Sequence, residues 1–323
     1  MAKALWYVGD GRAELREEAV APPGGGEVRV RALYGAISRG TERLVASGRV
    51  PASEYERMRA PLMAGAFPFP VKYGYATVGR VEEGGTPGQV VFVLHPHQDE
   101  FTIPAKMAVP VPKAVPPARA VLAANMETAL NALWDGVPGP ADRIAVIGGG
   151  IVGLLIARLA ARMPGTEVTL VDIVPERAAL ARALGARFAM PDEAPRDCDL
   201  VVHTSASPKG LATALALAGD EATIVELSWY GTGEVAVPLG EAFHSRRLRL
   251  VASQVGQVAP SHRSRWTHGR RLAAALALLD DPALDVLLAP AIGFDELPAR
   301  IPALLATTGD ARCPLIRYPA RLE

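Results

Sequence analysis

Three glycines and one aspartate form the most specific chemical pattern in the sequence. Gly148, Gly150 and Gly153 give the spacing G-x-G-x-x-G, and Asp172 follows them by about 20 residues. Glycines at this spacing let a backbone turn approach a pyrophosphate, and the following helix start offers unpaired N–H groups to the phosphates. A carboxylate at the position of Asp172 can accept hydrogen bonds from both hydroxyls of a ribose. The pattern predicts a dinucleotide site; the alternative is a glycine-rich turn without a ligand.

The residues around this pattern predict the elements that would position it. Residues 143–147 are a short apolar run, typical of a strand buried on both faces. Residues 151–163 are apolar on all sides except for two arginines, which favours a helix packed on a sheet. Residues 168–171 form a second strand-like run. The pattern as a whole runs strand, glycine turn, helix, strand and acid, and it indicates a dinucleotide site more specifically than the glycines alone. Ile151 and Val152 lie at the helix start that is predicted to bind the phosphates.

The rest of the chain divides into a β-rich part and an α/β part. Glycine and proline turns separate candidate strands at 4–8, 27–33, 75–81, 90–94 and 100–103, and residues 53–63 suggest a short helix or an ordered loop. Helices are expected at 118–134, 175–184, 208–218 and 270–279, and strands at 199–203, 222–227, 248–252 and 313–318. Alternating strands and helices predict a mostly parallel, doubly wound sheet. The last strand could return to pair with the first domain.

Length, charge and cysteine usage limit the class of protein. A chain of 323 residues has room for two domains, and we expect a first domain at 1–118, a dinucleotide-binding domain at 119–261, and a return to the first domain at 262–323. Zero net charge argues against nucleic-acid and membrane partners. Cys198 and Cys313 cannot build a disulfide framework, which favours the cytoplasm. We expect neither a signal peptide nor a membrane span.

Several stretches of the chain resemble the medium-chain dehydrogenase/reductase superfamily, over nearly the full length. The matching stretches are SRGTE at 38–42, the glycine strand at 74–81, residues 128–133, GGGIVG at 148–153, VTLVD at 168–172 and IGFDELPA at 292–299. More narrowly, ISRGTE and KYGYATVGRVEEG are similar to the bacteriochlorophyllide a dehydrogenase branch. The resemblance implies an α/β fold with a GroES-like β domain and an inserted Rossmann domain. It also implies hydride transfer with a nicotinamide cofactor, and a homodimer.

The chain departs from the zinc-dependent members of that family at each ligand motif. The first motif, at 37–42, contains no cysteine, the second reads GYA at 74–76 in place of Gly-His-Glu, and the third reads ANM at 124–126. A tetrahedral zinc site needs three protein ligands besides water, so we expect no metal. His95 and His97 are more typical of polar residues at a strand end than of a ligand pair.

Without zinc, hydrogen-bond donors must stabilise the charge that develops on the substrate oxygen. The resemblance places Tyr75 where the family has its histidine ligand, facing the nicotinamide, although a core tyrosine is an equal interpretation. It matches Thr41 with a hydroxyl that relays the proton, and Ser38 could supply a second hydroxyl. Simple turn chemistry is the alternative for both. We therefore take Tyr75, Thr41 and Ser38 as the candidate catalytic residues.

Further candidates for cofactor contact come from the family and from the ends of the predicted strands. Thr128 matches the family threonine beside the nicotinamide. Ser205, Leu227 and Ser228 follow predicted strands, whose carboxyl ends line the cofactor crevice in doubly wound sheets. The neighbour of Thr128, Glu127, is either a polar site residue or a solvated helix position.

The charged candidates bear on the choice of cofactor. Arg39 could bind the cofactor's phosphates or an acidic substrate group, or it could simply be solvated. Asp172 favours NAD over NADP, because its carboxylate would repel a 2′-phosphate. Arg177 is the opposing indication, but we expect it within the helix after Pro175.

These patterns leave three functions open. The first is an NAD(H)-dependent, zinc-independent oxidoreductase that acts on a small-molecule alcohol or ketone. The second is a reductase of the C=C bond of an enone or quinone, and the third is a dinucleotide-binding sensor or scaffold without turnover. Apolar residues between the motifs at 37–42 and 74–76 indicate either a sizeable apolar substrate or ordinary packing. They are Tyr55, Met58, Met63, Phe67 and Phe69.

Overall fold

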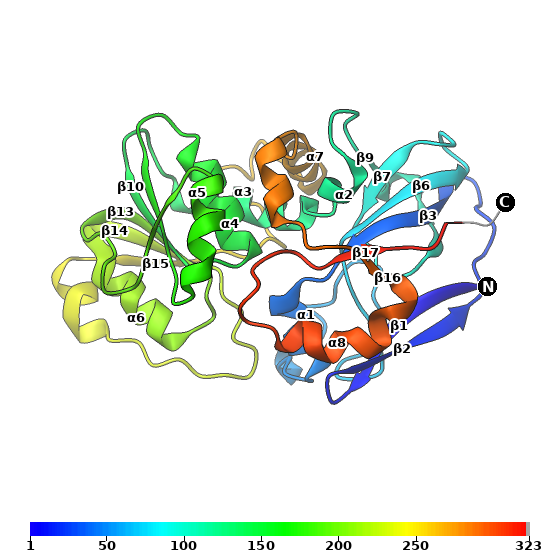
Figure 1. Cartoon of the computed structure of the whole chain (residues 1–323), viewed down its shortest axis with the longest axis horizontal. Coiled ribbons are helices and arrows are strands. Elements are labelled where there is room, and N and C mark those ends of the chain that lie inside the picture. The colour runs from blue at the N-terminus through cyan, green and yellow to red at the C-terminus, as the bar shows by residue number, and fades with distance from the viewer. Residues whose placement is uncertain (321–323) are drawn as a thin grey trace.

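The computed structural model describes residues 1–320 and contains two units, each built around sheets (Figure 1). The first strand and the last strand of the chain both lie in the β-rich unit, on the right of Figure 1, and the parallel sheet with its helices lies on the left. The chain therefore passes from the β-rich unit into the α/β unit and comes back.

The β-rich unit contains two sheets. One has the order β2-β1-β5-β4, with β1 (Ala2–Gly9), β2 (Arg12–Glu18), β4 (Ala64–Gly65) and β5 (Val71–Lys72). The other has the order β16-β17-β3-β6-β7-β9, and β8 also pairs with β3. Its strands are β3 (Glu27–Ala36), β6 (Thr77–Glu83), β7 (Val90–Val93), β8 (Glu100–Pro104), β9 (Val109–Pro110), β16 (Ile292–Gly293) and β17 (Leu315–Arg317).

The return of the chain to the first unit is a direct strand pairing. β17 runs antiparallel to β3, with Leu315 opposite Ala36. β3 alternates as its sequence predicts: Val28, Val30 and Ala32 are buried in the core, and the residues between them are partly exposed. The position of β17 agrees with the strand expected at 313–318, while the domain boundaries themselves stay a proposal.

The α/β unit is a six-stranded parallel sheet in the order β12-β11-β10-β13-β14-β15. Its strands are β10 (Arg143–Ile147), β11 (Glu167–Val171), β12 (Arg187–Ala189), β13 (Cys198–His203), β14 (Ala218–Glu226) and β15 (Arg249–Ala252). Its helices are α3 (Ala123–Gly136), α4 (Ile151–Ala161), α5 (Ala178–Ala183) and α6 (Pro208–Leu217). In the sheet, β11 and β12 lie on one side of β10, and β13, β14 and β15 lie on the other. The switch point between β10 and β13 is where doubly wound sheets bind ligands.

Several elements differ from the sequence-based expectations. The helix expected at 118–134 is interrupted, with α2 (Pro117–Ala120) before α3. Residues 53–63, expected as a short helix or an ordered loop, are a loop that follows the 3₁₀ turn Ala52–Glu54. β2, β12 and α8 (Leu297–Ala306) were not predicted. β2 reads RAELREE, with no apolar run, and α8 contains Pro302 in its interior, so neither has the usual pattern of its type.

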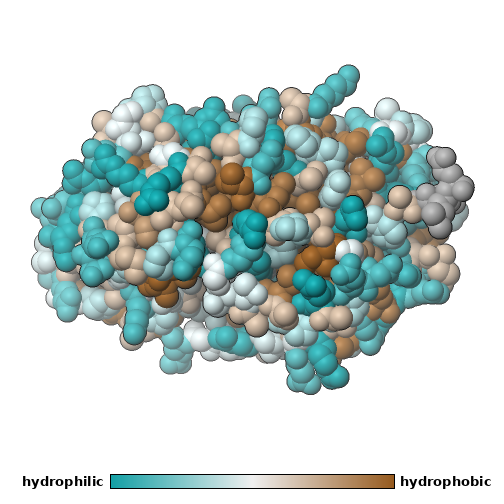
Figure 2. All heavy atoms as spheres, in the orientation of Figure 1, coloured by the Kyte–Doolittle hydropathy of each residue, from teal (hydrophilic) through white to brown (hydrophobic). Residues whose placement is uncertain are grey.

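The remaining helices pack on one unit or the other. α1 (Arg39–Ala46) follows β3, and α8 packs near it and against β2. α7 (His268–Leu278) packs on α3 of the α/β unit. Figure 2 shows polar and apolar side chains interspersed on one face, with apolar residues gathered near its middle. Within residues 1–320, we find no helix with the length and apolar character that a membrane crossing requires.

Candidate functional site

The glycine turn has the backbone geometry that a phosphate site requires. Gly148 has φ +104°, a conformation that other residues rarely adopt. A Cβ at Gly153 would lie 2.0 Å from the Gly148 carbonyl oxygen, so the start of α4 packs directly on the turn. A Cβ at Gly150 would meet no atom within 4 Å, which leaves the outer side of the turn open. The first helical hydrogen bond runs from Leu154 N to Gly150 O, so the N–H groups of residues 151–153 have no partner within the helix.

Asp172 is linked to this turn and is already engaged by backbone and side-chain donors. Its buried carboxylate accepts from Gly149 N at 2.5 Å and from Val174 N at 2.9 Å. Arg177 Nη1 lies 2.5 Å from Asp172 Oδ2. Arg177 does lie in the helical segment after Pro175, as the last residue of a 3₁₀ turn (Pro175–Arg177) that leads into α5, and its side chain reaches the acid. The carboxylate that the sequence predicts to bind a ribose is therefore also half of an ion pair.

Two partly buried guanidinium groups contact the C-terminal segment. Arg177 donates to the carbonyl of Thr308, and Arg39, the first residue of α1, donates to the carbonyl of Asp310. The Nε atoms of both arginines are buried and have no hydrogen-bond partner within residues 1–320. Burial lowers the pKa of Arg39, although Asp310 opposes that effect. Unpartnered N–H donors on two nearby cations fit an anionic group, such as the phosphates of a dinucleotide.

The three candidate catalytic hydroxyls lie together at the start of α1. Burial raises the pKa of Tyr75 to about 12, and hydrogen bonding with the hydroxyls of Ser38 and Thr41 opposes that rise. Ser38 is the N-cap of α1, but its own backbone N–H donates to Glu42 Oε1 at 2.7 Å and its side chain makes no cap hydrogen bond. Glu42 thus caps the helix and leaves the Ser38 hydroxyl free to face Tyr75.

The residues around the family's metal motifs do not fit a zinc ion. Glu42 is 1% exposed, and its other oxygen accepts from Tyr7 Oη at 2.5 Å and pairs with His97 Nε2 at 2.9 Å. His95 stacks on Phe101 with ring centroids 3.6 Å apart, and burial lowers its pKa to about 3. Across residues 1–320, no group of three or more His, Cys, Asp or Glu side chains could hold a metal ion. The polar side chains named here are therefore engaged in hydrogen bonds or stacking.

The predicted cofactor residues at the strand ends lie together at the switch point, whereas Thr128 lies on a helix. A Cβ at Gly148 would lie 2.8 Å from Ser205 N, so Ser205 is next to the glycine turn. Leu227 N donates to the carbonyl of the last residue of β13, and Ser228 Oγ accepts from Ala206 N at 3.0 Å. Thr128 lies on α3, and its hydroxyl donates back to Ala124 O at 3.0 Å. The proton of this hydroxyl is therefore used within its own helix, while its oxygen can still accept a hydrogen bond.

Several polar residues at the site were not identified from the sequence. Glu226 at the end of β14 binds His203 at the end of β13, with 2.7 Å between Oε2 and Nδ1. The sequence could have indicated this pair, because a polar residue ends each of two apolar strands, His203 in β13 and Glu226 in β14. Glu127, by contrast, is a buried ion-pair partner of Arg271 Nε at 3.0 Å, and Arg271 also donates to Asn131 at 2.6 Å. The alternative of a solvated helix position was wrong for Glu127.

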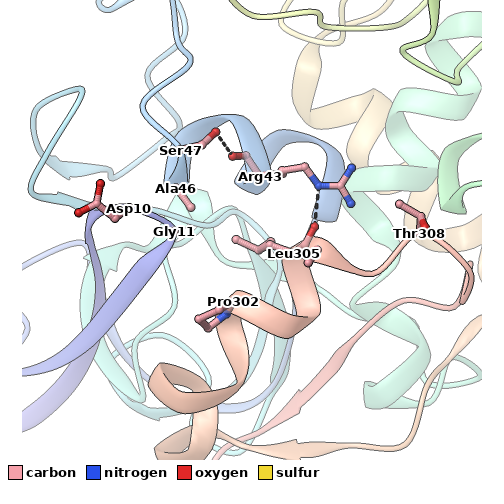
Figure 3. Close-up of a pocket in the computed structure, with 9 residues that line it drawn as sticks. Asp10, Gly11, Arg43, Ala46, Ser47, Pro302, Leu305 and Thr308 are labelled. Atoms are coloured by element: carbon pink, nitrogen blue, oxygen red, sulfur yellow. Dashed lines mark hydrogen bonds between the residues drawn. The ribbon is translucent and has the colours of Figure 1, made fainter.

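The apolar residues considered for substrate binding belong to the core of the β-rich unit. Met63 and Phe67 are buried there, and the others pack against the same cluster. A separate hollow of about 420 Å³ lies between α1 and α8 (Figure 3). Arg43 and Ser47 lie one turn apart at the end of α1, where Ser47 Oγ donates to Arg43 O at 2.6 Å, and Arg43 Nε donates to the Leu305 carbonyl at 2.6 Å. This hollow contains none of the candidate catalytic or cofactor residues.

Comparison with known proteins gives the fold a clear set of relatives in structure. No family model matches the chain. A Sinorhizobium meliloti 1021 dehydrogenase described as zinc-binding and bound to NADP superposes with a TM-score of 0.79 at 20% identity, covering 98% of this chain and 99% of that one. A protein described as a short chain alcohol dehydrogenase from Escherichia coli CFT073, in complex with NADH, gives 0.78 at 18% identity, with 98% and 99% covered. Bacillus subtilis 2R,3R-butanediol dehydrogenase gives 0.78 at 16% identity, with 99% and 100% covered. The chain therefore has the medium-chain dehydrogenase fold, with GroES-like and Rossmann domains.

Proposed function

We propose that this protein is an oxidoreductase that transfers a hydride between a nicotinamide dinucleotide and an alcohol or ketone, without a metal ion. The observation that carries the proposal is the open glycine turn at the switch point, hydrogen-bonded through Gly149 to the buried carboxylate of Asp172. The structural neighbours with bound NADP or NADH support the cofactor class, and their names as dehydrogenases support the substrate class.

The residues that would hold the dinucleotide lie around the glycine turn. The N–H groups of Ile151 and Val152 point from the helix start, and the Nε of Arg39 is a buried donor without a partner. Asp172 would accept from the ribose hydroxyls. When bound, the nicotinamide ring supplies the hydride chemistry. We propose NAD rather than NADP, because the carboxylate of Asp172 would repel a 2′-phosphate and the charge of Arg177 is already paired with it.

The hydroxyl cluster would handle the substrate oxygen. Because its pKa is raised to about 12, Tyr75 keeps its proton at neutral pH and can donate a hydrogen bond to an oxygen that gains negative charge. Ser38 and Thr41 lower the cost of removing that proton, since their hydroxyls stabilise the phenolate. This arrangement gives a zinc-free member of the fold a donor where the family resemblance would place a metal ligand.

The assembly and the compartment complete the proposal. The family resemblance implies a homodimer through the edge of the Rossmann sheet, and β15 is one of its two edge strands, with Leu250 38% exposed. Both cysteines are buried and unpaired, which agrees with a reducing cytoplasm. We also keep the bacteriochlorophyllide a dehydrogenase-like branch as a proposal that rests on the ISRGTE and KYGYATVGRVEEG stretches alone.

Two experiments test the function. The first is a hydride-transfer screen at 340 nm over alcohols, ketones, enones and quinones. Turnover of enones or quinones alone would contradict the alcohol chemistry, and tight NADH binding without any turnover would favour a sensor.

The second experiment compares Tyr75→Phe with Tyr73→Phe, a neighbouring buried tyrosine whose ring centroid is 6.0 Å away. We expect Tyr75→Phe to lower kcat by roughly 100-fold with NADH affinity unchanged, because a positioned proton donor typically contributes that factor. Tyr73→Phe should leave kcat near the wild-type value. An unchanged kcat for Tyr75→Phe would exclude Tyr75 as the donor.

A further inference from the structure

A hydrogen-bonded chain leads from a carboxylate on β14 to an exposed hydroxyl beside the glycine turn. Glu226 Oε2 lies 2.7 Å from His203 Nδ1, and His203 Nε2 lies 2.7 Å from Ser205 Oγ. His203 is fully buried, whereas Ser205 is exposed. The backbone of Gly210 packs tightly against one side of these hydrogen-bonded side chains, because a Cβ at Gly210 would lie 2.3 Å from Ser205 Oγ and 2.7 Å from His203 Nε2. The two distances are those of good hydrogen bonds throughout.

The direction of each hydrogen bond follows from the charge on Glu226. Burial alone would raise the pKa of Glu226, but hydrogen bonds from His203 and Ser228 outweigh that effect and lower it. The ionised carboxylate can only accept, as it does from Ser228 N at 2.7 Å and Tyr230 Oη at 3.1 Å. His203 Nδ1 must therefore carry a proton. In the neutral ring Nε2 is then an acceptor, so Ser205 donates to it and turns its lone pairs toward solvent.

Serine, histidine and carboxylate in this order are also the groups of a nucleophilic triad. Acyl transfer needs a donor for the oxyanion, commonly the backbone N–H of the residue after the serine. That group, Ala206 N, already donates to Ser228 Oγ at 3.0 Å. The chain of three residues therefore fixes the orientation of a hydroxyl without providing the donor that an acyl intermediate would need.

The place of Ser205 in the sheet indicates what this hydroxyl meets. It follows β13, and Gly148 follows β10, so the two residues stand on either side of the switch point. We propose that His203 and Glu226 are positioning residues that hold Ser205 as a fixed hydrogen-bond acceptor for a hydroxyl or amide N–H of the bound dinucleotide. This inference rests on the proposed function, because it assigns the hydroxyl to the same cofactor.

Glu226 also fixes the segment that crosses to the β-rich unit. The carboxylate binds Ser228 N and Tyr230 Oη, and a little further on Thr232 N donates to Arg49 O at 3.1 Å. A Cβ at Gly231 would lie 2.4 Å from that same carbonyl, so the crossing segment packs closely on the end of α1. A change at Glu226 can therefore affect the unit interface as well, and Ser205→Ala is the cleaner variant for binding.

The first test reads the tautomer of His203 without any cofactor. Long-range ¹H–¹⁵N spectra of histidine-labelled protein, with His203→Gln to assign the signal, should show a neutral ring protonated on Nδ1. Glu226→Gln should move the proton to Nε2, since a neutral amide can donate to Nδ1 where the carboxylate could only accept. A wild-type ring protonated on Nε2 would overturn the inference.

The second test is a fluorescence titration with NADH. Ser205→Ala and Glu226→Gln should each weaken NADH binding by roughly tenfold, the effect of one lost or misdirected hydrogen bond. The control is Thr213→Ala, which removes an exposed hydroxyl that donates to Lys209 O on the same helix. If the wild-type protein binds NADH and Ser205→Ala binds it equally tightly, this inference is overturned and the proposed function is not. A wild-type protein that binds neither NADH nor NADPH would overturn the proposed function and this inference with it.

Discussion

Two alanine substitutions in the glycine turn should separate packing from cofactor binding. At Gly153 the new Cβ would lie 2.0 Å from Gly148 O and 2.8 Å from Thr204 Oγ1, whereas real Cβ contacts are not shorter than 3.0 Å. Backbone atoms of the turn or of α4 must move to make room. At Gly150 the new Cβ would meet nothing within 4 Å, and its φ of −75° suits any residue. The added methyl group therefore clashes with neighbouring atoms at Gly153 and extends into open space at Gly150.

The structure sets the expected size of each effect. Overpacking a tight site costs about 1–3 kcal/mol, and each kcal/mol lowers the Tm of a large domain by about 2 °C or more. We therefore expect Gly153→Ala to lower the Tm by about 2–6 °C and also to weaken NADH binding, since the turn moves. Gly150→Ala should leave the Tm within about 1 °C of wild type. Its methyl group would stand where the pyrophosphate approaches, so NADH affinity should fall by roughly tenfold or more.

Differential scanning calorimetry and NADH fluorescence titration on the same preparations make the comparison. Gly269→Ala is the matched control, because a Cβ there also meets no atom within 4 Å and the residue lies at the start of α7, away from the turn. It should change neither quantity appreciably. Unchanged NADH affinity for Gly150→Ala would refute the assignment of the turn to the pyrophosphate. An unchanged Tm for Gly153→Ala would refute the packing of α4 on the turn.

Three further substitutions test the charged groups. Asp172→Ser should raise the ratio of kcat/KM for NADP over NAD by roughly tenfold, because like charges a few ångströms apart cost on the order of 1 kcal/mol or more; an unchanged ratio would remove the basis for choosing NAD. Arg271→Met should lower the free energy of unfolding in urea by about 3–5 kcal/mol, since it leaves a buried carboxylate unpaired, while the exposed neighbour Arg270→Met should cost less than about 1 kcal/mol; equal losses would contradict the buried pair. Hydrogen bonding from Arg158 holds the pKa of Asp281 below its usual value, so this carboxylate stabilises the fold above its unfolded pKa and loses that contribution as the pH falls through the lower folded value. Asp281→Asn should therefore reduce the Tm at neutral pH, and the difference from wild type should shrink below about pH 4; a difference that is constant with pH would exclude the carboxylate charge as the cause.

The parts of the fold predicted correctly are those fixed by local sequence. β10, the glycine turn, α4 and β11 follow one another within a short segment, and each has the pattern of its type. The return of a last strand to the first unit was also predicted, whereas its direction and its pairing with β3 were not. β2 and α8 were missed because charged residues and an interior proline replace the usual pattern.

The contacts that define the site could not be predicted, because they join residues far apart in the sequence. Arg39 reaches the carbonyl of Asp310, and Glu42 collects donors from Ser38, Tyr7 and His97. Residue types at these positions indicated polar chemistry. Only the packing of α1 against the end of the chain decides which donors are already used and which are left for a ligand.

We propose that this protein transfers a hydride with a nicotinamide cofactor and without a metal ion. The most direct measurement is the NADH-linked rate at 340 nm with an alcohol or ketone found by screening, taken before and after treatment with a strong chelator, with zinc measured on the same sample. The predicted result is an unchanged rate at well under one zinc per chain. A rate that disappears on chelation and returns with stoichiometric zinc would contradict the account.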